Sequence, residues 1–514
     1  MMKNNNIPNI PAEKFRFVAD NERLHDQKFE TKQVSYFRDA FNRFCKNKSS
    51  VTAAIIIIVL VLYAIIVPIA CETTYSRDLQ NTLYLSYGKL LPKNQFFADM
   101  GWEFWDGANE QVVGESTYIA MQAIEAETGM PAIKRLIGTS TDEKGKITYN
   151  CRVDSYVNLG YSYVTLTQEQ YDDLQAWQLE HGVQVIYPAV TDGKASDARV
   201  WYDANRKGVP KLDENGDFVN VYRTSGRDGD YNSLRIDGDP GKLDPEASDR
   251  YRYAHVTGNS EAISYKCRVF MYTYFQYKFG FEPAFLMGTT ALGQDMMTRL
   301  ASAARFSLIF AVFVSAINLS IGAVIGAIEG YYGGAVDMVI ERIIDILARV
   351  PFMVVASLFQ LHLASKVGPI WSMLFAFVLT GWIGMAGTTR MQFYRYKGQE
   401  YVLAARVLGA SDWRIMFRHI FPNALGTIIT SSVLVIPGVI FSESSLTYLG
   451  IVNLDSSTMT SVGTMLANGR QFLSSHPHII LFPALFISLL EISFNLFGNG
   501  LRDAFNPSLR GADE

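Results

Sequence analysis

No pattern for phosphate binding or for a catalytic metal occurs in this sequence of 514 residues. A loop that cradles phosphate needs G-x-x-x-x-G-K-[ST], because its backbone amides and lysine hold the phosphates and its hydroxyl holds Mg²⁺. The Gly-Lys pairs that begin at Gly88, Gly145, Gly193 and Gly241 are each followed by Leu, Ile or Ala. None of the seven histidines belongs to an H-E-x-x-H zinc motif. We therefore expect no catalytic or ATPase site in this chain and no metal or cofactor of its own.

Two of the four cysteines could form a covalent link. Cys151 and Cys267 lie in similar pentapeptides, Tyr-Asn-Cys-Arg-Val and Tyr-Lys-Cys-Arg-Val. Apolar and polar residues alternate around both, which predicts two β-strands. A Cys151–Cys267 disulfide is compatible with this pattern if the region lies in an oxidising compartment. Two buried, reduced thiols are equally compatible with it.

One polar stretch near residue 400 has the features of a docking element. Residues 399–408 favour a helix, which Gly409 is expected to end. Ser411 or Asp412 can cap a second helix, and Pro422 is expected to break it. The sequence therefore predicts two short helices at an angle to each other.

The residue types on these two helices suit contact with another protein. Ala404, Ala405 and Gly409 are small, so a partner surface can approach closely. Trp413 and Phe417 offer apolar anchors for a groove on that partner. An amphipathic loop on lipid headgroups would explain the nearby arginines but not the small residues.

Six stretches are apolar enough to cross a bilayer, which takes about 20 residues of helix. The third has four charged residues in its first half, so that half is expected to project from the bilayer or to face the protein interior. The expected spans are Val51–Ala70, Phe306–Ile328, Met338–Leu363, Ile370–Met385, Leu425–Phe441 and Ile479–Phe497.

Basic residues predict the orientation in the membrane. Arg38, Arg43, Lys46 and Lys48 precede the first span, and such residues favour the cytoplasmic side. Six spans then return the C-terminus to the cytoplasm. The arginine-rich loop 390–424 falls on the same side. The net charge of -4, with no dense basic field, argues against a nucleic-acid partner.

The long region between the first two spans must then lie outside the membrane. It has short strands and turn signals, which predict an inserted domain of α/β or mostly β structure. The fold class is therefore an all-α polytopic membrane protein with this inserted domain. The expected order is a cytoplasmic tail with a short helix (1–50), the first transmembrane helix (51–71), the extracytoplasmic domain (72–285), a helical core (286–505) that contains the loop at about 395–424, and a cytoplasmic tail (506–514).

The loop resembles the EAA loop of ABC-importer permeases. Glu400, Ala404, Ala405 and Gly409 match E-x-x-x-A-A-x-x-x-G, with Pro422 following. Further passages resemble the second permease subunit of dipeptide and oligopeptide importers, the OppC/DppC type. They lie at 36–48, 288–295, 330–337, 445–450 and 494–507, and the resemblance covers about residues 36–71 and 286–510.

This resemblance implies a type I permease fold in a bacterial cell membrane, surrounded by lipid. It also implies a second permease subunit, two cytoplasmic ATP-binding subunits that hold ATP and Mg²⁺, and an extracytoplasmic substrate-binding lipoprotein as partners. The cargo would be peptides. The residues that would couple this chain to the ATPases are Glu400, Ala404, Ala405, Gly409, Ala410 and Arg414.

Some residues depart from the family pattern. Thr290 stands where Asp is usual and Gln294 where Arg is usual, and the large insert is absent from the common short members. Nickel chelates or oligosaccharides as cargo, or a membrane sensor that uses the external domain, are therefore alternatives. Glu491 lies inside the last span, where a charge is costly. It is expected either to face the pathway or the partner permease, or to be buried and hydrogen-bonded.

Overall fold

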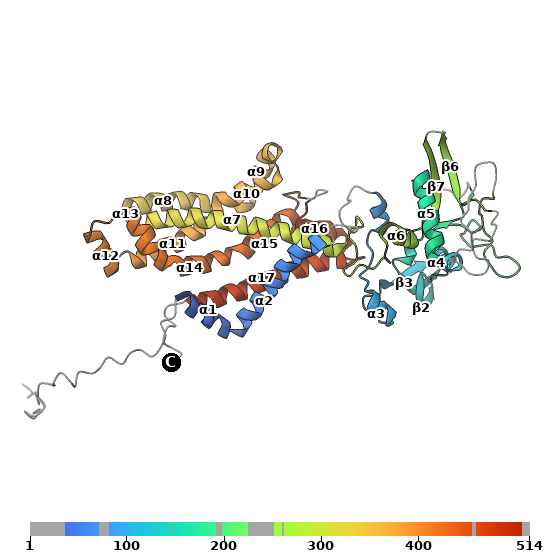
Figure 1. Ribbon diagram of the computed structural model, residues 1–514, viewed down its shortest axis with the longest axis horizontal. Coiled ribbons are helices and arrows are strands. Elements are labelled where there is room, and N and C mark those ends of the chain that lie inside the picture. The colour runs from blue at the N-terminus through green and yellow to red at the C-terminus, as the bar shows by residue number, and fades with distance from the viewer. Residues whose placement is uncertain are drawn as a thin grey trace, which may run out of the picture.

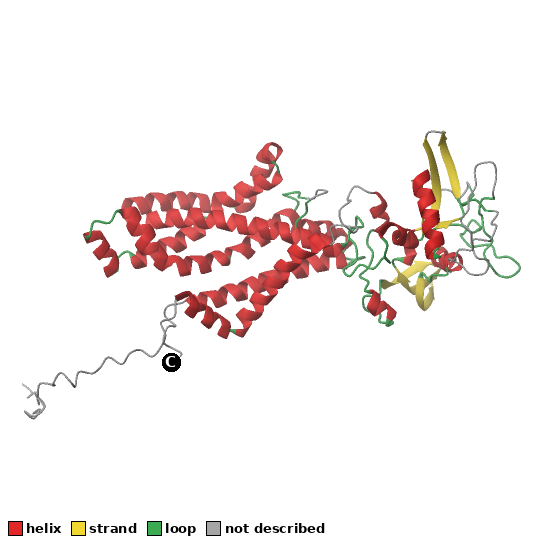
Figure 2. Ribbon diagram, viewed as in Figure 1, coloured by secondary structure: helices red, strands yellow, loops and turns green. Residues whose placement is uncertain are grey.

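The computed structural model has two parts, a long helical bundle and an α/β domain at one end of it (Figure 1). It describes residues 36–70, 82–143, 145–191, 198–224, 251–259, 262–454 and 459–505. Most of the expected N-terminal tail, Cys71 and the C-terminal tail lie outside these residues. Figure 2 separates the parts by type of structure, since the described strands all lie in the domain and the bundle is helical.

Apolar helices long enough to cross a membrane form the bundle. Five such helices, and a sixth span made of a bent pair, contain all six expected apolar stretches, which confirms them as helical. The bundle elements are α1 (Tyr36–Lys46), α2 (Lys48–Ala70), α7 (Met296–Tyr332), α8 (Gly334–Ala348), α9 (Phe352–Val367), α10 (Pro369–Gly381), α11 (Ile383–Tyr396), α12 (Glu400–Val407), α13 (Asp412–Arg414), the π-helical η6 (Ile415–Ile420), α14 (Phe421–Val433), α15 (Val435–Tyr448), α16 (Val462–Gly469), η7 (Arg470–Phe472) and α17 (His478–Phe505).

The third expected span, Met338–Leu363, is wrong as a single straight helix. Helices α8 and α9 meet at an angle of 75°. Pro351 stands at the break, where it lacks an amide hydrogen and disfavours a helical conformation of the residue before it. The charged half, α8, has no buried residue, so the alternative that it faces the protein interior is also wrong.

Glycines let α7 and α11 pack backbone to backbone. Gly322, Gly326 and Gly330 lie one turn apart on α7, and a Cβ at any of them would overlap atoms of α11. At Gly326 the overlap would be with the carbonyl oxygen of Ala386. Small residues at such spacing allow close helix contact where no hydrophobic effect drives association. These three glycines, which we call the glycine groove, fix α7 against α11.

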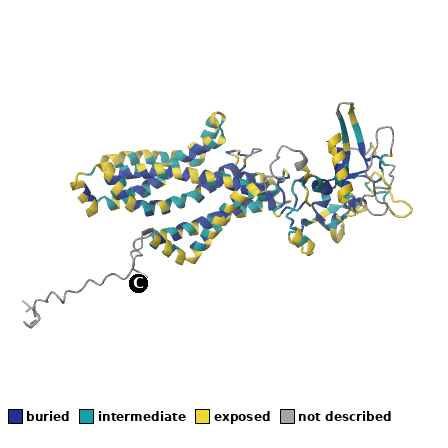
Figure 3. Ribbon diagram, viewed as in Figure 1, coloured by how far each residue is buried: buried dark blue, intermediate teal, exposed yellow. Residues whose placement is uncertain are grey.

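The outward faces of the bundle are apolar. Figure 3 shows buried residues along the inside of the bundle and exposed ones on its surface. On α2, Ile55, Ile58 and Val59 are each 56% exposed, while Leu60 and Ala64 are buried against α7 and α17. Apolar side chains on an outer surface of this kind suit contact with lipid rather than water.

The domain is mixed α/β, which decides between the two expected types. It has two antiparallel sheets, with strand orders β1-β3-β2 and β4-β7-β5, and β6 also pairs with β7. Its elements are η3 (Thr82–Tyr87), α3 (Gln95–Asp99), β1 (Ala108–Gly114), α4 (Glu115–Thr128), β2 (Ile133–Thr141), β3 (Ile147–Asp154), η4 (Val157–Leu159), β4 (Tyr161–Thr167), α5 (Gln168–His181), β5 (Ile186–Tyr187), β6 (Ala254–Asn259), β7 (Ala262–Phe270) and α6 (Met271–Phe279).

The two sheets are copies of one strand–helix–strand–strand module. β1 and β4 have 7 residues each, and α4 and α5, which follow them directly, have 14 each. Both helices end at a glycine with positive φ, Gly129 and Gly182. The register also agrees, because Cys151 faces the fourth residue of β1 and Cys267 faces the fourth residue of β4. The repeated pentapeptide is therefore the last strand of each module.

The second module contains an insertion within one strand. In the first module β2 pairs along the whole of β3. In the second, β5 and β6 share that place, since Tyr187 pairs with Arg268 and Ala254 pairs with the adjacent Cys267. Residues 188–253 therefore interrupt a strand that is otherwise equivalent to β2.

A buried ion pair joins the two modules. Arg268 on β7 donates to both carboxylate oxygens of Glu127 on α4, at 2.8 Å each, and neither side chain is exposed. Tyr222 donates to the same carboxylate at 2.5 Å. The guanidinium carbon lies 3.7 Å from the ring centre of Tyr161. Arg268 also donates from Nε to the carbonyl of Ala198 at 2.7 Å. Both charged groups thus have hydrogen-bond partners at fully buried positions, which is the condition for such a pair to be tolerated.

Replacing Glu127 with alanine is expected to destabilise the domain strongly. The charge of Arg268 would stay buried without its partner, which costs roughly 3–5 kcal/mol. Hydrogen exchange of peptides from β4 and β7, in the purified full chain in detergent, measures this loss. Glu103→Ala is the control: its carboxylate pairs with Arg135 at 2.6 Å, both half exposed, and should contribute less than about 1 kcal/mol. Equal effects of the two changes would contradict this role of the pair.

The possible Cys151–Cys267 disulfide is not formed. Both are free, buried thiols, and they lie on the last strands of two different sheets. Burial raises the pKa of Cys267 to about 12. The alternative of two reduced thiols is the one found.

Candidate functional site

The loop at residues 400–420 lies at the end of the bundle opposite the α/β domain (Figure 1). Helix α12 begins at Glu400, ends at Val407 and is followed by Gly409 with φ of +82°, as expected. Ser411 stands at the N-cap of the next helix in an extended conformation, although its side chain makes no capping hydrogen bond. The first expected helix and the start of the second are therefore confirmed.

The expected break at Pro422 is wrong. A helix of 37 residues runs from Asp412 to Tyr448 through this proline. The turn before it, Ile415–Ile420, is π-helical, and Phe421 donates its amide to the carbonyl of Met416, five residues back. A wider turn of this kind relieves the contact between a proline ring and the preceding turn. The loop is thereby continuous with the membrane helix α14–α15.

An apolar cluster fixes the loop to the bundle. Val402 from α12 and Ile415, Met416 and Ile420 from η6 are at most 3% exposed. They pack with Ala327 and Tyr331 of α7 and with Phe393 of α11, as one cluster. The loop therefore packs on α7 and α11, the same two helices that meet at the glycine groove.

Polar contacts hold the second short helix to the end of α7. Tyr331 donates to one carboxylate oxygen of Asp412 at 2.6 Å, and Tyr332 donates to the other at 3.3 Å. Arg406 donates to the Tyr331 hydroxyl at 3.5 Å and lies over its ring. A displacement of Asp412 must therefore pull on α7.

A second set of contacts ties α8 to α11. Arg390 donates to both carboxylate oxygens of Asp337, at 2.6 and 2.9 Å, and pairs with Glu341 at 3.3 Å. Tyr394 donates to Asp337 at 2.8 Å, and Lys397 donates to the carbonyl of Gly330 at 2.9 Å. Bidentate pairs of this type hold a fixed geometry. Helices α7, α8 and α11 therefore form one unit beneath the loop.

The loop exposes large apolar side chains among its polar ones. We call four of these apolar side chains, Leu403, Val407, Leu408 and Trp413, the outer face. Their exposed fractions are 46%, 87%, 86% and 62%. Trp413 packs against Phe417, with ring centres 4.2 Å apart and ring planes tilted by 42°, so its position is supported.

The residues predicted for coupling do not all lie on this surface. Glu400, Ala404, Gly409 and Arg414 are exposed, and Ala410 is half-buried. Ala405 is 9% exposed and faces inward. It lies about 100° around α12 from the exposed Ala404, so the two small residues are on different faces of the helix. The sequence pattern did not single out Val407 and Leu408, although both are apolar residues in a loop.

Carboxylates and amides inside the helices form a separate group. Glu491 on α17 is half-buried, and its Oε1 has no hydrogen-bond partner in the part of the chain that is described. Glu443 on α15, which is fully buried, accepts from Ser307 of α7 at 2.9 Å. Asn318 on α7 is 1% exposed. The last two were missed, although a polar residue within an apolar run is the signal that finds them.

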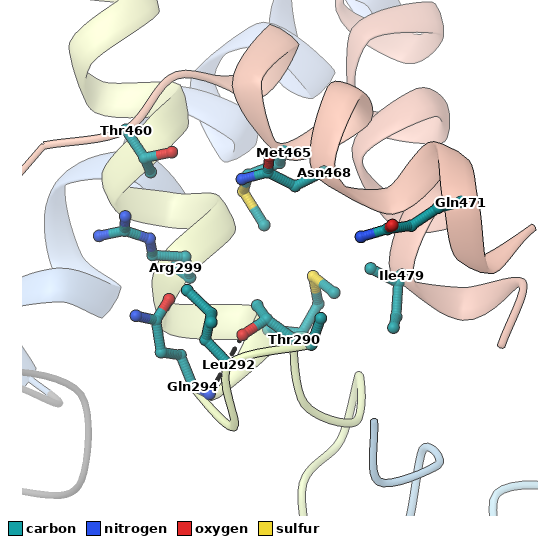
Figure 4. A pocket seen from close by; sticks show the side chains of 11 residues that line it. Thr290, Leu292, Gln294, Arg299, Thr460, Met465, Asn468, Gln471 and Ile479 are labelled. Carbon is teal, nitrogen blue, oxygen red and sulfur yellow. Dashed lines mark hydrogen bonds between the residues drawn. The ribbon is translucent and has the colours of Figure 1, made fainter. Parts of the chain in front are cut away.

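A cavity of about 210 Å³ opens at the domain end of the bundle. Figure 4 shows side chains from the start of α7 and from α16 and η7 around it. Thr290 and Gln294, which both depart from the family pattern, line this cavity. The hydroxyl of Thr290 accepts a hydrogen bond from the backbone amide of Gln294 at 3.1 Å. The departures thus lie together at the mouth of the bundle.

Comparison with known proteins defines the class as a transport permease. The family model for a binding-protein-dependent transport system inner membrane component matches residues 321–511. The model for the N-terminal TM domain of oligopeptide transport permease C matches residues 35–92. Residues 93–320 lie between the two matches.

Curated relatives narrow the class to one family. The oligopeptide transport system permease protein OppC of Bacillus subtilis (strain 168) is 40% identical over 43% of this chain and 72% of its own length. The dipeptide permease DppC of the same organism is 39% identical over 43% of this chain and 68% of its own length. The glutathione permease GsiD of Pectobacterium atrosepticum is 32% identical over 45% of this chain and 75% of its own length. This chain belongs to the OppC/DppC-type permease subunits of ABC importers, integral proteins of the bacterial inner membrane.

Among solved structures, a chain of the inward-facing methionine ABC transporter MetNI matches 41% of this chain and 98% of its own length. The identity is 13% and the TM-score is 0.32, which is too low to support an argument.

Proposed function

We propose that this chain is one of the two permease subunits of an ATP-driven peptide importer. The observation that carries the proposal is the outer face, four exposed apolar side chains on a loop that is firmly packed against α7 and α11. Such a surface suits docking into a groove of a partner. The relatives' names, which concern oligopeptides, dipeptides and glutathione, support peptides as the cargo.

In this proposal the loop is cytoplasmic and receives the movement of two ATP-binding subunits, which hold ATP and Mg²⁺. Glu400, Ala404, Gly409, Ala410 and Arg414 contact those subunits around the outer face, and Ala405 packs the loop onto the bundle. Closure of the ATPases displaces Asp412, and α7 moves with it as a rigid body. The bundle then changes between inward-facing and outward-facing arrangements.

The α/β domain lies outside the cell in this orientation, because it is at the opposite end of α7 from the loop. A substrate-binding lipoprotein delivers cargo there, beside the cavity that Thr290 and Gln294 line. Glu491, with its unpaired oxygen, faces the second permease or the pathway. Both termini are cytoplasmic.

Purification of the tagged chain from its native membranes in mild detergent tests the proposal. We expect two ATP-binding subunits, a second permease and a binding lipoprotein to be recovered with it. Recovery of a signalling kinase instead, in a preparation where other membrane complexes survive, would support a sensor and overturn the proposal.

A further inference from the structure

A second cavity lies within the helices, between α7, α9, α10 and α15. Its volume is about 300 Å³. Its walls include Phe352 and Phe377, whose ring centres are 4.8 Å apart. Asn318, which lines it, lies near the middle of the apolar stretch Phe306–Ile328 of α7. A stretch of this length matches the hydrocarbon layer, so the cavity lies at the depth of that layer.

Asn318 brings an unsatisfied polar group to this cavity. Its side chain is 1% exposed, and its Oδ1 has no hydrogen-bond partner among the described residues. An unpaired polar atom in a buried site is energetically unfavourable. Gly381 makes room for it, because a Cβ there would overlap the amide. The fold thus holds Asn318 in place but gives its Oδ1 no hydrogen-bond donor among the described residues.

The remaining walls are neutral and leave one side open. Thr380 and Ser442 add hydroxyl groups, and none of the described residues that line the cavity is charged. A Cβ at Gly438 would have no heavy atom within 4 Å, so space continues beside it. Polar groups at this depth face a bundle interior or a water-filled cavity rather than lipid.

We propose that this cavity is a contact site for the peptide backbone of the cargo as it crosses the membrane, with Asn318 pairing to a peptide group. A carboxamide offers one acceptor and two donors. It can accept from the N–H of a peptide bond and donate to a carbonyl, whatever the side chains are. A neutral site of this kind suits a pathway that carries peptides of varied sequence. This inference rests on the proposed function.

Uptake of two labelled peptides by cells that hold the whole importer tests the site. The peptides are trialanine and trialanine methylated on its central nitrogen, which lacks one N–H donor. Asn318→Leu should lower trialanine uptake about tenfold. This corresponds to the loss of one hydrogen bond between Asn318 and the peptide group. The ratio of trialanine to methylated-peptide uptake should fall about fivefold or more. Because the binding protein is unchanged, a change in this ratio belongs to the permease.

Two glycine variants test the cavity itself. Gly438→Leu fills the open space and should lower uptake of both peptides about tenfold or more. Gly384→Leu on α11 is the matched control, since a Cβ there also has no neighbour within 4 Å but the residue does not line the cavity. Its uptake should stay within about twofold of wild type, as for other substitutions without lost contacts.

Three results would overturn the inference. An unchanged uptake ratio in Asn318→Leu would exclude recognition of the peptide group. Loss of the second permease on purification of that variant would make Asn318 a subunit contact instead. A wild-type importer that assembles with its ATPases but takes up neither peptide would overturn the proposed peptide cargo as well, and only that result affects both.

Discussion

Leu408→Asp should abolish ATP-driven uptake while the chain itself still folds and inserts. The side chain is 86% exposed, so its replacement removes almost no internal contact, and such changes cost within about 0.5 kcal/mol of stability. Against a partner, a buried apolar anchor is worth about 2 kcal/mol or more, and an aspartate there would also be desolvated. ATPase binding should therefore weaken at least about thirtyfold.

Co-purification of the ATP-binding subunits and peptide uptake in the same strain measure this effect. Leu408→Met keeps an apolar side chain of similar volume and should retain both. Val112→Asp places the same charge at another apolar position, 71% exposed, in the α/β domain, and should keep the ATPases bound. Leu408→Asp cells with normal uptake and normal ATPase recovery would refute the docking role of the outer face.

Gly326→Leu is expected to prevent stable folding of the bundle. The new Cβ would overlap the carbonyl oxygen of Ala386, which belongs to backbone and cannot rotate away. Helices α7 and α11 would have to separate, and the cluster that fixes the loop would lose its support. Overpacking of this kind costs typically about 1–3 kcal/mol, and more where backbone must move.

The amount of monodisperse chain recovered in detergent shows whether this expectation holds. Gly384→Leu, on α11 itself, adds the same side chain where a Cβ has no neighbour within 4 Å. It should be recovered at the wild-type level. Equal recovery of both variants would mean that the close contact at Gly326 is not needed for folding.

Composition predicted the membrane helices well, because a run of about 20 apolar residues has few alternatives to a spanning helix. Local breaks were harder. Pro351 bends its span by 75°, whereas Pro422 does not end its helix. The difference lies in the π-helical turn at Ile415–Ile420, which cannot be predicted from a single sequence. The first short helix of the loop and the start of the next one followed from Gly409, whose positive φ ended the first helix as expected.

Other parts of the site depended on contacts between distant residues. The inward direction of Ala405 follows from the packing of α12 on η6, not from its size. Asn318 lies within a long apolar run and Glu443 lies among serines at the end of another, so an averaged hydropathy hides both. The repeated pentapeptides were visible, but the second module was not, since residues 188–253 separate the two parts of one of its strands.

That interrupted strand has a consequence for how the domain can vary. Tyr187 and Ala254 face neighbouring residues of β7, so the chain departs and returns at a single step of the ladder. Ala189 and Arg252 continue the pairing outward, with 2.7 Å between amide nitrogen and carbonyl oxygen. Excision between Tyr187 and Ala254 would leave the strand pairing of β7 in register, but it would remove Ala198 and Tyr222, which bond the buried pair of Arg268 and Glu127. Segments of different length can therefore leave and re-enter the sheet at this junction if they replace those two contacts, so that the outer end of the protein can diversify while its membrane helices stay the same.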